Sequence, residues 1–177
     1  FGKYLVIFLL LAGTISLVSG FLVADGSMII AYNEGFEKYK IEDGNFRLGE
    51  KANKAQLKAI QELGVTVYDL FYAEEPLTNG STLRIYQDRD QVDLVCLMDG
   101  EMPTGTDEIA IDRMYADNNG LTIGDKLESG ARSWIVTGLV ALPDYSCLFS
   151  DNNDSMFDAV KFGVAIVTPE MFADFGK

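Results

Sequence analysis

Histidine is absent from this 177-residue chain, and cysteine occurs only twice. Without histidine, neither a Ser-His nor a Cys-His nucleophile can be assembled. A zinc site is disfavoured as well, because two cysteines that lack a close ligand spacing do not supply its usual nitrogen and sulfur donors. We therefore predict no catalytic, metal-binding or cofactor-binding residues, and we expect that the chain is not an enzyme.

Basic residues are also scarce, since 14 Lys and Arg stand against 27 Asp and Glu, a net charge of −13. Such a surface repels a phosphate backbone, so nucleic acid is not expected as a partner. The sequence contains no P-loop and no G-x-G-x-x-G pattern. Any ATP hydrolysis must therefore belong to another chain or domain.

The strongest feature that is present is an uncharged, apolar run over residues 4–24. At 1.5 Å per residue such a run spans about 30 Å, the thickness of the hydrocarbon core of a bilayer. Lys3 precedes the run and Asp25 follows it, which favours a cytoplasmic N-terminus and an extracytoplasmic location for residues after about Asp25. A cleaved signal peptide and a buried globular helix are the alternatives.

A helical stalk over residues 26–42 and a β-α-β-β subdomain over residues 43–103 are predicted next. The subdomain begins with a strand at residues 45–48, and Asn53 with Gln56 then forms a capping box for a helix that stops at Gly64. Residues 65–72 and 82–86 predict a hairpin around the turn Asn79-Gly80. The apolar run at residues 92–98 predicts a central strand that is covered on both faces.

Residues 104–177 predict a second, strand-rich subdomain that is incomplete at its C-terminus. Strands are expected at residues 108–112, 121–127, 133–140 and 157–168, and a short helix from Arg113 is expected to end at residues 118–120. The predicted fold class is therefore α/β, of the α+β kind with mixed sheets. A transmembrane helix over residues 1–25 and the stalk precede the two small subdomains.

The acidic residues offer two candidate clusters. Residues 151–162 begin like a calcium loop, but Met156 and Phe162 occupy the positions where an EF-hand requires Gly and Glu. A looser calcium site among Asp151, Asp154 and Asp158 and a solvated loop are the two alternatives. The second cluster, in which acids alternate before an apolar run, is predicted to be exposed edge charge. It consists of Asp88, Asp90 and Asp93.

The cysteines, one turn and the aromatic residues complete the candidates. Cys96 and Cys147 either pair outside the cell or stay unpaired with Cys96 buried. Gly124 and Asp125 predict a structural turn with positive φ and a carboxylate acceptor for nearby N–H groups. Most aromatic side chains are expected in the core, and the loop over residues 143–157 would form a partner surface if exposed.

Five motifs follow the membrane helix and stalk in a particular order. They are LMDGEMP at residues 97–103, EIAID at 108–112, Ala116, NGLTIGDKL at 119–127 and WIVTGLV at 134–140. In that order they resemble the extracytoplasmic core domain of MacB-type, FtsX-like permeases of ABC transporters, over most of the chain. That domain normally leads into further membrane helices, which are not in this sequence, so we interpret the chain as a fragment of a longer subunit.

The resemblance implies a bacterial cell membrane protein whose partners are a cytoplasmic ABC ATPase subunit, membrane lipid and a second permease copy. ATP-driven closure would pass through the membrane helix and stalk to the extracytoplasmic domain. That domain would engage an exported peptide, a lipid-linked molecule or an extracellular accessory protein. The alternative is a membrane-anchored or secreted ligand- or protein-binding domain without an ATPase partner.

Overall fold

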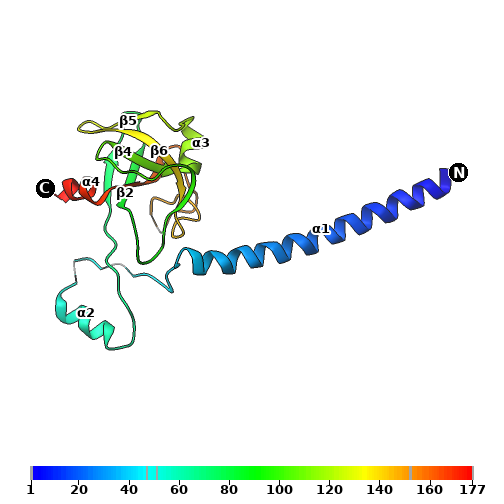
Figure 1. Ribbon diagram of the computed structural model, residues 1–177, viewed down its shortest axis with the longest axis horizontal. Helices are drawn as coiled ribbons and strands as arrows, with labels where there is room; N and C mark the ends of the chain where they lie inside the picture. The colour runs from blue at the N-terminus through cyan, green and yellow to red at the C-terminus, as the bar shows by residue number, and fades with distance from the viewer. Residues whose placement is uncertain (1, 47, 51, 152, 177) are drawn as a thin grey trace. The chain divides into compact units, whose positions relative to one another are not determined.

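In a computed structural model, which describes residues 2–46, 48–50, 52–151 and 153–176, the N-terminal part is one uninterrupted helix, α1 (Gly2–Lys38) (Figure 1). The helix runs through both the predicted span and most of the predicted stalk, and none of its residues is buried. A core helix of a soluble protein would bury its apolar side chains. By length and composition α1 can cross a membrane, a property that it shares with signal sequences.

Residues from Tyr39 onward form a second compact unit. Its first helix, α2 (Lys54–Gln61), begins where the sequence predicts, because the capping box at Asn53 is complete. The Asn53 side chain accepts hydrogen bonds from the backbone N–H groups of Ala55 and Gln56, and the Gln56 side chain accepts one from the Asn53 N–H. Gly64, at a φ of 83°, allows the chain to turn away after the helix.

A mixed sheet of seven strands forms the body of this second unit (Figure 1). Its strand order is β1-β2-β7-β4-β6-β3, and β5 pairs with the first part of β6. The β2–β7 and β4–β6 pairs are parallel, whereas the other pairs are antiparallel. The strands are β1 (Ala73–Pro76), β2 (Thr82–Gln87), β3 (Cys96–Gly100), β4 (Glu108–Asp112), β5 (Lys126–Glu128), β6 (Ser133–Ala141) and β7 (Phe162–Val167).

The sheet curves until the ends of β1 and β5 meet. Leu77, directly after β1, forms an antiparallel bridge with Ser129, directly after β5. The Thr78 N–H donates to the Glu128 carbonyl at 2.8 Å beside this bridge. Pairing these two ends satisfies backbone groups that an open sheet would leave exposed at its edges.

The core lies around β7, which sits between β2 and β4 and is buried at all six residues. Helix α3 (Arg113–Asn119) starts and ends as predicted, with Asp112 as its N-cap and Gly120 at its end, and it contributes Tyr115 to this core. The Tyr115 ring packs against Gly163, where an added Cβ would lie 2.5 Å from the ring. The Tyr115 hydroxyl pairs with the Ser81 hydroxyl at 2.7 Å. This contact ties α3 to the sheet.

Two predictions about the first strands are wrong. Residues 65–72 have no regular structure, and the hairpin instead pairs β1 with β2. No strand occurs among the described residues near 45–48, of which residue 47 lies outside the description. Strand propensity is dominated by the neighbours that a strand finds, and the Ala-Glu-Glu-Pro sequence of β1 finds β2 despite its low propensity.

The apolar run at residues 92–98 was wrongly expected to form a central, covered strand. Its strand, β3, lies at the end of the sheet order and pairs with β6 alone among the described strands. Leu97 and Met98 are 41% and 50% exposed. An apolar run does not by itself distinguish a central strand from an edge strand, because long-range pairing decides its place.

The predicted subdomain boundary at residues 103 and 104 runs through the sheet, because β2 pairs with β7 and β3 pairs with β6. Strands β4, β6 and β7 lie within or close to their predicted ranges. The strand predicted at residues 121–127 is shorter than expected, since only β5 is extended there. Thr122 and Asp125 form a turn before β5, in which the Asp125 N–H donates to the Thr122 carbonyl at 3.1 Å.

Candidate functional site

The segment that directly follows α1 is hydrogen-bonded to the chain that leads into β3. The Leu94 N–H donates to the Tyr39 carbonyl at 2.8 Å, and the Asp93 N–H donates to the Lys40 carbonyl at 3.0 Å. Residues 39–42 and 90–96 are called the junction below. The last residue of α1 is thus followed at once by backbone that is bonded to the sheet unit.

Side chains reinforce the junction. The Asp93 carboxylate accepts a hydrogen bond from the Glu42 N–H at 2.9 Å, and the Tyr39 hydroxyl donates to the Cys96 sulfur at 2.9 Å. The Lys40 ammonium donates to the Asp90 carbonyl at 3.3 Å. Because these bonds join residues far apart in the sequence, the junction closes only when the sheet unit has folded.

Backbone strain is concentrated at the same place. Lys40 and Asp93 adopt φ values of 47° and 49°, and within the described ranges they are the non-glycine residues with positive φ. This left-handed region is costly for a side chain with a Cβ, although Asp tolerates it better than Lys. The two strained residues are bonded to each other, so the strain is held by the junction itself.

A buried ion pair connects the junction to the segment after β6. The Arg89 guanidinium donates two hydrogen bonds, both 3.0 Å long, to the Asp144 carboxylate. The two side chains are only 6% and 13% exposed. Arg89 also donates to the Asp93 carbonyl at 3.4 Å and lies 4.7 Å from the centre of the Tyr86 ring. Movement of Asp93 would therefore act directly on Arg89 and Asp144.

The surroundings of the Glu42 carboxyl group change its pKa. Partial burial raises its pKa above the ordinary value, and the charges of Asp93 and Asp144 raise it further. A hydrogen bond from the Asn45 amide opposes the rise. Protonation of Glu42 thus relieves like-charge repulsion at the junction.

A second buried arginine, Arg84, anchors β1 and the late loop to β2. Arg84 donates two hydrogen bonds to Glu74, at 2.6 and 3.0 Å, one to the Tyr145 hydroxyl and one to the Ser150 carbonyl. Burial by itself would lower the pKa of Arg84, but the hydrogen bonds to Tyr145 and Glu74 have the larger combined effect and raise this pKa. These charge-assisted hydrogen bonds satisfy the buried guanidinium and give Arg84 a structural role.

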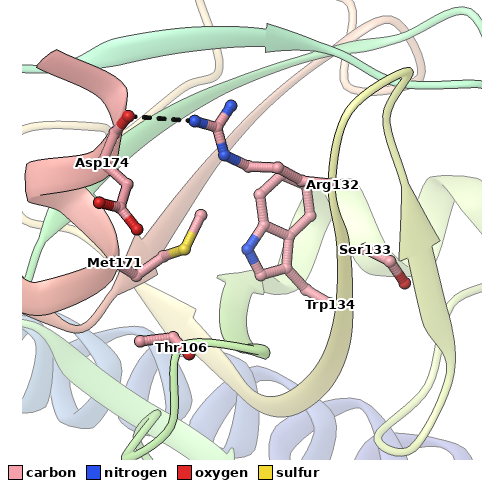
Figure 2. A pocket seen from close by; sticks show the side chains of 6 residues that line it. All are labelled: Thr106, Arg132, Ser133, Trp134, Met171 and Asp174. Carbon is pink, nitrogen blue, oxygen red and sulfur yellow. Dashed lines mark hydrogen bonds between the residues drawn. The ribbon is translucent and has the colours of Figure 1, made fainter. Parts of the chain in front are cut away.

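An open hollow of about 460 Å³ lies beside β6 and the C-terminal helix α4 (Pro169–Ala173) (Figure 2). Figure 2 shows the indole nitrogen of Trp134 directed toward Met171, and Arg132 donating to the Asp174 carbonyl at 3.2 Å. Trp134 is 1% exposed, and its Nε1 has no hydrogen-bond partner among the described residues. Thr106 and Ser133 complete the lining.

The acidic clusters of the sequence behave differently from one another. Asp93 is 2% exposed, so the prediction that Asp88, Asp90 and Asp93 are all exposed edge charges is wrong for Asp93. Asp88 and Asp90 are exposed, as predicted. Burial of Asp93 arises from its bonds with Glu42 and Lys40, which no local pattern contains.

The late acidic loop uses its carboxylates for its own turns. Asp154 accepts hydrogen bonds from the Ser150 hydroxyl and the Asp151 N–H, and these bonds lower its pKa. Asp158 accepts from the N–H groups of Val160 and Lys161. In the part of the chain that the structure describes, no group of three or more Cys, Asp or Glu side chains is arranged to hold a metal ion.

The turn and cysteine predictions have clear outcomes. Gly124 adopts a φ of 95°, and the Asp125 carboxylate accepts a hydrogen bond from the Thr122 N–H at 2.7 Å, so the predicted structural turn is confirmed. Cys96 and Cys147 do not form a disulfide, and both are half-buried. The aromatic prediction is mixed, because Tyr86 and Phe162 are in the core whereas Phe149 and Phe157 remain partly exposed.

Comparison of the chain with protein-family models, curated proteins and solved structures gave no match. The junction is the arrangement that sequence reasoning missed. Lys40, Arg89 and Asp144 carry no motif, and the one local signal was an acidic residue before an apolar run, at Asp93. The junction lies within the sheet unit, where it holds the residues that directly follow α1 against the segment that leads into β3.

Proposed function

We propose that this chain is the first membrane helix and the extracytoplasmic domain of an ABC transporter permease subunit of the MacB-type, FtsX-like kind. Its role is conformational and its ATPase is a separate cytoplasmic subunit. The junction is the observation that supports this proposal, because α1 continues without a break to Lys38 and is followed at once by residues bonded to the sheet unit.

A displacement of α1 would reach the junction through the backbone, because residues 39–42 follow Lys38 directly. A continuous helix is stiff, so displacement of its membrane segment reaches Lys38 and then Tyr39 and Lys40. Their carbonyls hold Asp93 and Leu94, and Arg89 passes the displacement of Asp93 to Asp144. Coupling of this kind requires packed and hydrogen-bonded elements that have two arrangements.

Such a subunit works in a bacterial cell membrane, with residues after about Asp25 outside the cytoplasm and a second permease copy beside it. The extracytoplasmic domain engages an exported peptide, a lipid-linked molecule or an accessory protein. Lys3 precedes the apolar run and the next basic residue is Lys38, which favours a cytoplasmic N-terminus and an extracytoplasmic sheet unit.

The proposal is tested by purifying the full chain, within its parent protein, from membranes in detergent and identifying co-purifying proteins by mass spectrometry. A stoichiometric ATPase is expected. Hydrogen exchange at the Asp93 and Leu94 amides of that complex should then change when a non-hydrolysable ATP analogue is added. An intact chain that brings no ATPase, in repeated preparations, contradicts the proposal.

The second candidate function is a membrane-anchored binding domain without an ATPase partner. The hollow at Trp134 favours it, because a buried indole N–H and the Arg132 guanidinium border a space that a small polar group would fit. Absence of the ATPase, together with a ligand that shifts the fluorescence of Trp134, would support this candidate instead.

A further inference from the structure

Residues 43–70, called the α2 lobe below, expose an unusual amount of apolar surface. None of the described residues in this range is buried. Six large apolar side chains on the lobe are each exposed by 47% or more. They are Phe46, Leu48, Leu63, Val65, Tyr68 and Leu70. A concentration of this kind on one short segment marks a surface that another phase or molecule covers.

The lobe differs from the rest of the sheet unit in charge. Residues 43–70 contain four acidic and four basic residues, whereas residues 71–177 contain 19 acidic and seven basic residues. The lobe is therefore neutral on a chain whose net charge is −13. Anionic headgroups attract segments with an excess of basic residues, which the lobe lacks, so a segment without net charge is matched to zwitterionic headgroups.

The residue types of the lobe are those of a membrane interface. Helix α2 places Leu57 and Ile60 on a less exposed side and Lys54 and Lys58 on an exposed one. Aromatic and aliphatic side chains at the boundary between headgroups and acyl chains, with lysines directed to water, are the usual composition of interfacial segments.

The length of α1 brings the lobe within reach of that interface. Residues 4–24 are long enough to span the hydrocarbon core, so Lys38 lies about 21 Å beyond the outer edge of the core along the helix, of which the headgroup layer occupies roughly the first 5–8 Å. The lobe begins five residues after Lys38, a distance of at most about 18 Å of extended chain.

We infer that the α2 lobe inserts its apolar side chains into the outer membrane–water interface, with zwitterionic lipid as its partner. This inference requires that α1 spans the membrane, and it does not require an ATPase partner. Failure of the ATPase experiment above therefore leaves it standing, and its own failure leaves the ATPase proposal standing.

The experiment uses the full chain reconstituted in phosphatidylcholine vesicles with and without bromine on the acyl chains. Trp134 is the only tryptophan and is buried, so it supplies a constant background. A second tryptophan is introduced as Leu63→Trp in the lobe or as Met156→Trp in the acidic late loop. The two positions are matched in exposure, at 80% and 82%.

The added emission of Leu63→Trp is expected to be quenched by brominated lipid and shifted to shorter wavelength, whereas that of Met156→Trp stays unquenched. Equal behaviour of the two variants overturns the inference, since the lobe would then be in water. A wavelength shift without quenching that disappears when the protein is diluted into excess lipid also overturns it, because a second copy of the chain would then cover the lobe. An unchanged Trp134 emission maximum serves as the check that each variant is folded.

Discussion

Lys40 and Asp93 lie in different parts of the sequence, yet both adopt left-handed backbone and are joined by a hydrogen bond from the Asp93 N–H to the Lys40 carbonyl. Each conformation is unfavourable for a residue with a Cβ. The bonds from Leu94 to Tyr39 and from Glu42 to Asp93 hold the pair in place. Strain that persists where two elements join is a reason to expect movement there.

Replacement of Lys40 by Gly should strengthen the junction. Glycine adopts positive φ without the Cβ penalty, and after its own entropic cost the net gain should be up to about 1 kcal/mol. Hydrogen exchange at the Asp93 and Leu94 amides should slow accordingly. Lys126→Gly in β5, where no positive φ is present, is the control and should destabilise the chain. Faster exchange in Lys40→Gly would show that the Lys40 side chain, and not its backbone, holds the junction.

Removal of one partner of the Arg89–Asp144 pair should cost much of the stability of the sheet unit. Arg89→Met leaves the Asp144 carboxylate buried without its counter-charge, and such changes cost about 3–5 kcal/mol. Urea unfolding followed by Trp134 fluorescence measures the loss. Arg113→Met, which breaks a pair with Asp117 that is more than half exposed, should change stability by less than about 0.5 kcal/mol. Similar losses in both variants would refute the importance of burial.

The junction should weaken as pH rises above the ordinary pKa of a glutamate. The pKa of Glu42 is raised from 4.5 in the folded chain, so the folded state keeps a proton that the unfolded state has lost. Stability from this group is fully present below pH 4.5 and declines as pH rises through the folded pKa. Hydrogen exchange at the Asp93 amide, corrected for its intrinsic pH dependence, should report the decline. Glu42→Gln should abolish it, and an unchanged pH slope in that variant would show that Glu42 is not its source.

Gly163→Ala should destabilise the core, because the new Cβ would lie 2.5 Å from the Tyr115 ring and 3.0 Å from the Leu83 side chain. Neither group can withdraw freely from a packed interior, and overpacking of this kind costs about 1–3 kcal/mol. Thermal unfolding of the two proteins measures the difference. Gly130→Ala is the matched control, since a Cβ there meets nothing within 4 Å. Equal melting temperatures for the Gly163 variant and wild type would mean that α3 can shift away from β7.

Elements with strong local signals were predicted well. The apolar run gave α1 by its length, the capping box at Asn53 gave the start of α2, and the turn residues at 118–120 gave the end of α3. Strands β4 and β6 lie where alternating or β-branched residues predict them. Gly124 was expected to have positive φ and does. Each of these features depends on one continuous run or on residues that are close to one another in the sequence.

The candidate site could not be found in this way. Asp93 belongs to a run of exposed-looking acids, and its burial depends on residues 39–42, about fifty positions earlier in the chain. Arg89 and Asp144 are ordinary charged residues until the fold brings them to 3.0 Å. Charges far apart in a sequence have no periodicity that would mark them as partners.

The amino-acid sequence by itself determined that the chain has one long apolar helix, an acidic body and no histidine for catalysis, because these properties are sums over residues or short-range patterns. Only the tertiary structure decided that β1 forms from Ala-Glu-Glu-Pro, that β3 lies at an edge, and that α1 leads into a strained, hydrogen-bonded junction. Those outcomes depend on which distant segments pair, and the free energy of pairing is set by backbone hydrogen bonds and burial that appear only once the sheet is assembled.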